Sequence, residues 1–60
     1  MTNYRIAVVE DAINVLEAFL PAERPLSLAE LTELTGLVKN KVFRILATLQ
    51  AHNFVTRNEL

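Results

Sequence analysis

The strongest local signal in the sequence is a serine and a glutamate three residues apart, followed six residues later by the only glycine of the chain. Ser27 can cap a helix through its side-chain oxygen, and the carboxylate of Glu30 can accept a hydrogen bond from the Ser27 amide. Gly36 can then adopt the left-handed conformation with which many helices end. The pattern predicts a short helix between Ser27 and Gly36, which is the best-marked element of the chain.

Leucines mark the side of this short helix that should face a core. Leu26 and Leu31 are placed to form a hydrophobic staple across its first turn. Leu28, Leu31 and Leu34 recur at three-residue spacing, which brings them to one side of a helix. We therefore expect these three side chains to be buried.

Two longer helices are expected on either side of the short one. Apolar residues at three- and four-residue spacing predict a first helix that ends before Pro21 and buries Ile6, Val9, Ile13, Leu16 and Leu20. The same spacing predicts a third helix, from about Val38 to His52, that buries Val42, Ile45, Leu46 and Leu49. Leu46 lies in the middle of this second stripe and is expected to be a central core residue.

The residues after the third helix have the pattern of a strand. Asn53 can take the left-handed conformation that ends a helix, and Phe54-Val55-Thr56-Arg57 is typical of the start of a strand. A single strand without a partner is unstable. We therefore interpret residues 54–60 as the first part of a hairpin.

Composition excludes several classes of function. A chain of 60 residues has room for one domain, and without cysteine it has no disulfides and no thiolate metal ligands. One histidine cannot build a zinc site, and we find no nucleophile with a base and no paired carboxylates, so we expect neither a cofactor nor an enzyme. Charged residues interrupt the most apolar stretch, residues 6–20, which argues against a membrane span. A cytoplasmic protein is the expectation.

The charges are unevenly distributed along the chain. Residues 1–38 carry two basic and six acidic side chains, whereas residues 39–60 carry four basic and one acidic side chain. The formal net charge is only −1. A chain of this kind can present a basic face to a polyanion while staying close to neutral overall.

Two short helices joined by a turn at a glycine are typical of a helix-turn-helix, whose second helix enters the major groove of DNA. Asn40, Arg44 and Ala47 lie opposite the apolar stripe of the third helix, where small or hydrogen-bonding side chains can approach base edges. Lys39 and Lys41 lie at the N-terminal shoulder of that face, where they suit phosphates. The third helix is therefore the candidate recognition helix.

The segment RPLSLAELTELTGLVKNKVFRILATLQAHNFV resembles the N-terminal DNA-binding domain of the IclR family of bacterial transcriptional regulators, and VVEDAINVLEAF resembles the first helix of that family. The resemblance covers roughly residues 8–57. It implies a mainly α fold, a three-helix winged helix-turn-helix with a short, incomplete wing strand at the C-terminus. We expect one domain over residues 1–60, truncated within the wing.

The resemblance also implies partners. Members of the family bind double-stranded operator DNA as homodimers or tetramers, and a C-terminal domain, absent from this sequence, binds a small-molecule effector. The chain departs from the family pattern at Asp11 (Arg in the family), Thr32 (Ala), Val38 (Pro or Ser), Asn40 and Lys41 (Ser-Thr) and Asn53 (Gly). Because Asn40 and Lys41 are expected at the DNA, the operator sequence stays open.

Together these arguments predict DNA contacts from Ser27, Lys39, Asn40, Lys41, Phe43, Arg44, Thr48 and Arg57. Basic residues on a helix are often merely solvated, and Phe43 could be either buried against the first helix or partly exposed toward DNA. The alternative function is a winged-helix module that binds other proteins and no DNA, which the net charge of −1 favours.

Overall fold

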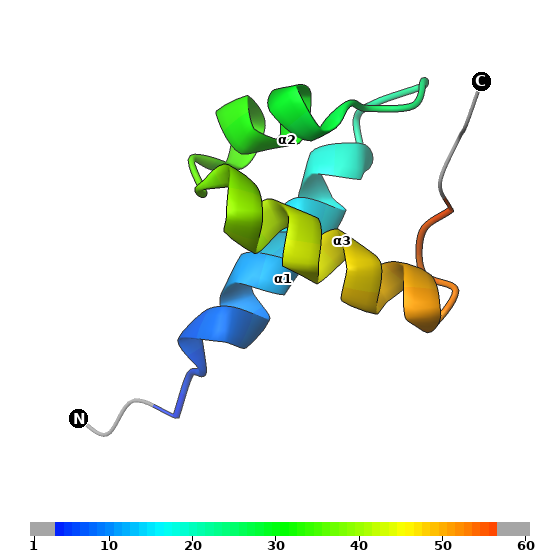
Figure 1. Cartoon of the computed structure of the whole chain (residues 1–60). Coiled ribbons are helices and arrows are strands. Elements are labelled where there is room, and N and C mark those ends of the chain that lie inside the picture. The colour runs from blue at the N-terminus through cyan, green and yellow to red at the C-terminus, as the bar shows by residue number, and fades with distance from the viewer. Residues whose placement is uncertain (1–3, 57–60) are drawn as a thin grey trace.

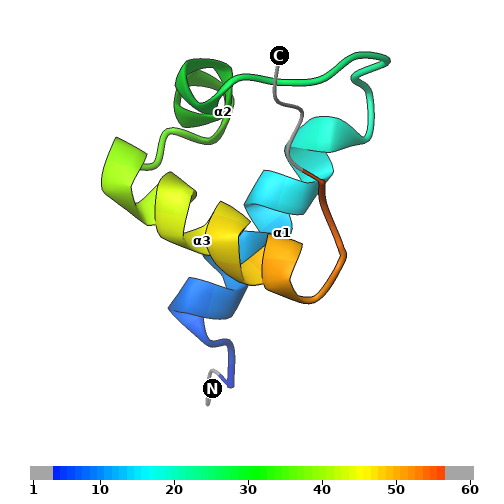
Figure 2. The same cartoon turned by 45° about the vertical axis from the view of Figure 1, so that its right-hand side comes forward.

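A computed structural model describes residues 4–56, which form three helices and no strand. The helices are α1 (Ala7–Phe19), α2 (Leu28–Thr35) and α3 (Lys39–Ala51). Each helix contacts the other two. α3 crosses α1, and α2 lies across one end of the pair (Figures 1 and 2). The mainly α, three-helix fold expected from the sequence is confirmed.

The start and end of α2 follow the predicted signals. The Glu30 amide donates to Ser27 Oγ at 3.0 Å, and the Ser27 amide donates to Glu30 Oε1 at 2.9 Å, which completes the capping box. Gly36 has a φ of +74°, and its amide donates to the Thr32 carbonyl at 2.9 Å. This single bond across a left-handed residue is the αL way of ending a helix.

The turn between α2 and α3 is held by a threonine. The Thr35 hydroxyl donates to the Leu31 carbonyl at 2.7 Å and accepts from the Leu37 amide at 3.2 Å. Val38 then provides an extended residue before α3, without a side-chain cap. The connection of residues 36–38 is therefore short and hydrogen-bonded at its start.

The end of α3 is also set by hydrogen bonds. Asn53 has a φ of +64°, as expected for the residue that ends this helix. Its amide donates to the Gln50 carbonyl at 3.0 Å, and the Phe54 amide donates to the Leu49 carbonyl at 2.9 Å. These two bonds form a Schellman motif. An asparagine can fill this position because it tolerates the left-handed region better than most residues.

The core is small and draws on all three helices. Val15 of α1, Leu31 of α2 and Val42 of α3 are almost completely inaccessible to solvent, and Ile45 of α3 is buried beside them. Leu46 is only half-buried, so the expectation that it would be the central core residue is wrong. The centre of the stripe lies one turn earlier in α3, where that helix passes both α1 and α2.

The predicted buried face of α1 is also wrong. Val15, outside the predicted stripe, is fully buried, whereas four stripe members are exposed: Ile6, Val9, Ile13 and Leu20. Apolar residues extend beyond the predicted stripe and include Val15, so their period alone cannot show which part of the apolar surface meets the other helices. In addition, the N-terminal half of α1 extends past the other two helices (Figure 1). The expectation that Leu34 is buried is wrong as well, since this side chain is 63% exposed near the end of α2.

Residues 54–56 do not form the predicted strand. They bend back toward the C-terminal end of α1 (Figures 1 and 2) and make no ladder with any other described residue. A strand requires a paired neighbour to satisfy its backbone groups, and residues 4–56 provide none. Arg57 and the rest of the predicted wing lie outside the described residues.

The buried leucine of α2 should control stability. Replacing Leu31 by Ala removes a side chain that is 1% exposed and should lower the free energy of unfolding by about 2–5 kcal/mol. Leu34→Ala is the matched control, because it makes the same change three residues away on the exposed side of α2. That variant should stay within about 0.5 kcal/mol of the wild type. Urea unfolding followed by circular dichroism measures both; equal losses would contradict the assigned core.

Candidate nucleic-acid interface

One face of α3 is polar, basic and open to solvent. Lys39, Asn40 and Arg44 are all exposed. Asn40 and Arg44 lie on the side of the helix away from the buried Val42 and Ile45, and Lys39 is the first residue of the helix, at the shoulder of that side. Asn40 and Arg44 are four residues apart and so project from the same side, one turn from each other. We call Lys39, Asn40 and Arg44 the outward face of α3.

Ion pairing distinguishes these cations from the others. Among residues 4–56, Arg5 pairs with Glu10, Arg24 with Glu30, and Lys41 with Asp11. Lys39 and Arg44 form no ion pair with any described residue. The two described Lys or Arg side chains without a carboxylate partner therefore both belong to the outward face of α3.

Lys41 differs from its neighbours because it is held by the first helix. Its Nζ donates to Asp11 Oδ2 at 2.9 Å. The Lys41 side chain is 46% exposed, while that of Asp11 is 19% exposed. Sequence reasoning missed this partner, because nothing in a local pattern indicates that residues 30 positions apart will meet.

Thr48 extends the exposed surface toward the C-terminal end of α3. Its hydroxyl donates to the Arg44 carbonyl at 2.9 Å, a local bond that many helical threonines make. The oxygen keeps acceptor capacity but its proton is used. Thr48 can therefore accept a hydrogen bond from a partner more readily than it can donate one.

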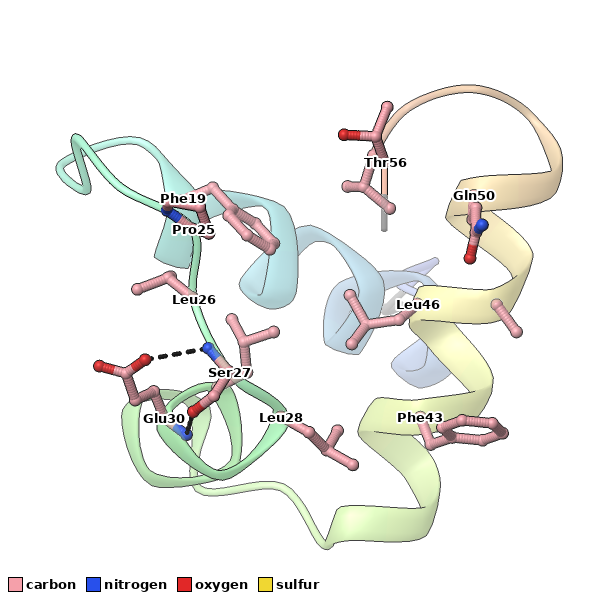
Figure 3. A pocket seen from close by; sticks show the side chains of 13 residues that line it. Phe19, Pro25, Leu26, Ser27, Leu28, Glu30, Phe43, Leu46, Gln50 and Thr56 are labelled. Atoms are coloured by element: carbon pink, nitrogen blue, oxygen red, sulfur yellow. Dashed lines mark hydrogen bonds between the residues drawn. The ribbon is translucent and has the colours of Figure 1, made fainter. Parts of the chain in front are cut away.

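Phe43 lies between the outward face and an apolar groove. Its side chain is 54% exposed, which decides the alternative left open by the sequence in favour of partial exposure. The groove has a volume of about 610 Å³ and separates α3 from the start of α2. Figure 3 shows Leu28 and Leu46 projecting into it, with Phe43 at its edge beside α3.

Ser27 lies across this groove from α3, at the first turn of α2. Its oxygen accepts the capping bond from the Glu30 amide (Figure 3), which leaves the hydroxyl proton free to donate. The structure thus gathers Lys39, Asn40, Lys41, Phe43, Arg44 and Thr48 on one helix and places Ser27 on a second. Arg57 lies outside the described residues.

The charge at the start of α2 is already neutralised within the domain. Arg24 Nη1 donates to Glu30 Oε1 at 3.1 Å, and a second bond joins Nη2 to Oε2. The hydrogen bond from Arg24, followed by the one from the Ser27 amide, lowers the pKa of Glu30 from its ordinary 4.5 to about 2. The Glu30 hydrogen bond and charge raise the pKa of Arg24. Arg24 was not among the predicted site residues.

Residues 4–56 lack two kinds of functional feature. They contain no group of three or more His, Asp or Glu side chains that could hold a metal ion. None of their helices is both long enough and apolar enough to cross a membrane.

The order of the helices, the αL turn at Gly36 and the exposed polar face of α3 define a helix-turn-helix domain. The model of the IclR helix-turn-helix domain matches residues 8–59, so the chain belongs to the IclR family of DNA-binding transcription regulators. No curated protein and no solved structure gave a match.

The ion pair at Glu30 should make stability depend on pH. The folded-state pKa is below the ordinary value, so the stabilisation is present above about pH 4.5 and is lost as pH falls toward about 2. Glu30→Gln keeps a capping-box residue but removes this titration. The difference in thermal midpoint between the wild type and this variant should therefore shrink across that window.

The control for this experiment is Glu33→Gln, which removes an exposed carboxylate of the same helix that has no ion pair with a described residue. The difference in thermal midpoint between Glu33→Gln and the wild type should change little between pH 5 and pH 2. A constant difference for Glu30→Gln over the same range would show that the Arg24–Glu30 pair does not persist in solution.

Proposed function

We propose that the chain binds double-stranded DNA sequence-specifically, as the DNA-binding domain of a transcription regulator, with α3 in the major groove. The observation that carries this proposal is the outward face of α3, where the two described cations without an ion pair lie beside Asn40. The major groove admits one α-helix. A helix that is supported from behind by Val42 and Ile45 can present such a face to base edges.

The side chains of α3 should divide into two roles. Arg44 and Asn40 project away from the core, and their guanidinium and amide groups can make paired hydrogen bonds to guanine and adenine edges. Lys39 lies at the first residue of α3, where the helix N-terminus also favours anions. A flexible ammonium at this position suits a phosphate better than a base.

Ser27, Phe43 and Thr48 complete the proposed contact surface. The free hydroxyl proton of Ser27 can donate to a phosphate. The exposed ring of Phe43 can contact the methyl group of thymine. Thr48 can accept from a base or bridge through water.

The family also guides what we propose about assembly. Because IclR regulators resemble one another in acting as homodimers or tetramers, we propose the same for the regulator to which this domain belongs, with a small-molecule effector bound outside the domain. A single domain then contacts one half-site. Its affinity for DNA in isolation should be modest.

Arg44 provides the main test of base recognition. A duplex is first enriched from a random pool by the wild-type chain, and Arg44→Ala is then measured on a panel of single-base variants of that duplex. The substitution should cost about 1–3 kcal/mol of binding and relax the preference at one position. A uniform loss across the panel would instead identify a phosphate contact.

Arg44→Lys serves as the matched control, because it keeps the charge but loses the planar fork. It should behave like Arg44→Ala if Arg44 reads a base, and like the wild type if Arg44 contacts a phosphate. If neither substitution changes binding, α3 is not the recognition helix.

Lys39 tests the phosphate role. Lys39→Ala should weaken binding to every duplex in the panel by the same factor. It should also reduce the slope of log affinity against log salt by about one, because one fewer counterion is released. Fluorescence anisotropy at several salt concentrations measures both quantities. A loss confined to particular base pairs would contradict this assignment.

The second candidate function is a module that binds proteins and not DNA. The net charge of −1 and the apolar groove beside α3 favour it. The salt titration separates the two functions. DNA binding requires log affinity to fall linearly with log salt, whereas the alternative allows no specific duplex binding at any salt concentration.

A further inference from the structure

The hydrogen-bonded ion pair between Asp11 and Lys41 connects α1 to the proposed recognition helix. The two atoms are 2.9 Å apart, and the residues are 30 positions apart in sequence. The carboxylate of Asp11 is the less exposed partner, at 19% against 46% for Lys41. Lys41 therefore remains accessible to a partner from solvent, while Asp11 is held between α1 and α3.

Lys41 lies next to the outward face of α3. At 3.6 residues per turn, it is rotated by about 60° from Arg44 around the helix. From this shoulder an extended lysine can reach a phosphate beside the groove. In the free protein, however, its ammonium is bonded to a carboxylate of the first helix.

We propose that Asp11 limits the DNA affinity of this domain by competing with a backbone phosphate for the Lys41 ammonium. The inference rests on the proposed function, because it takes DNA as the partner of α3. Carboxylate and phosphodiester each carry one negative charge and accept hydrogen bonds from the same group. When DNA binds, Lys41 leaves Asp11, and the uncovered carboxylate then lies close to the phosphates and repels them.

The size of the effect follows from the exposure of the pair. An ion pair that is partly open to solvent is weak, so Asp11 tunes binding and does not prevent it. Replacing Asp11 by Asn keeps the shape of the side chain and removes the charge. We expect the Asp11→Asn variant to bind DNA about two- to fivefold more tightly at low salt.

Two controls separate this role from a general change in charge. Glu17→Gln makes the same change in net charge at an exposed position of α1 that has no ion pair with a described residue. Its gain in DNA affinity should be smaller than that of Asp11→Asn. When Lys41 is already replaced by Gln, adding Asp11→Asn should increase DNA affinity by no more than Glu17→Gln increases that of the wild type. The gain depends on both partners, so a double-mutant cycle should show coupling.

The experiment measures the wild type and these four variants on the enriched duplex and on an unrelated duplex of the same length. The gain should be equal on both duplexes, because a phosphate contact carries no sequence information. Thermal melts of each variant accompany the binding curves. An Asp11→Asn variant that melts earlier and binds more weakly would show that the pair only fastens α1 to α3, and would overturn the proposal.

Other outcomes would contradict the inference alone or the proposed function as well. If the wild type binds DNA and Asp11→Asn shows no gain, or its gain persists in the Lys41→Gln background, the inference fails while the proposed function stands. If the wild type binds no duplex at any salt concentration, the proposed function fails and the inference fails with it.

Discussion

Three aliphatic side chains hold the helices together: Val15 of α1, Leu31 of α2 and Val42 of α3. Burying one such side chain contributes roughly 1.5–3 kcal/mol. That is large in a domain of this size, whose core rarely supplies more than about 3–5 kcal/mol of net stability. Among the described residues, only Ile45 is buried in addition to these three. Each buried side chain therefore contributes both to the stability of the domain and to the orientation of α3. The direction in which Arg44 projects therefore depends on side chains on the opposite side of the same helix.

Local hydrogen bonds determine where α3 begins relative to α2. The capping box sets the first residue of α2, and the left-handed Gly36 sets its last. The Thr35 hydroxyl then accepts a hydrogen bond from the Leu37 amide. This bond restrains the short connection between α2 and α3. A helix-turn-helix needs this definition, because a shift of one residue would rotate the outward face of α3 by about 100°.

The sequence predicts these local features well and the packing less well. Ser27, Gly36 and Asn53 each act through bonds to neighbours within a few residues, so their roles can be read from spacing. The buried face of α1 cannot, because Val15 and Ile13 are equally apolar, and the helices that α1 meets decide which of them is covered. The same holds for the pairing of Asp11 with Lys41, which exists only once α1 and α3 have packed. The features of the candidate site that could not be predicted from the sequence are therefore those that depend on contacts between residues far apart in the chain.

Charge pairing explains how a domain with a net charge of −1 can suit a polyanion. At physiological ionic strength, charges more than about 8 Å apart on a surface are largely screened. A carboxylate in contact with a cation therefore has a strong electrostatic effect on it, whereas a distant carboxylate has a weak one. Glu10 and Glu30 each form an ion pair with an arginine outside α3. Lys39 and Arg44, both on α3, have no ion pair with a described residue. Among residues 4–56, Asp11 is the acidic side chain that forms an ion pair with this helix. Under the function proposed for α3, DNA affinity then depends less on the total charge of the chain than on which carboxylates contact α3.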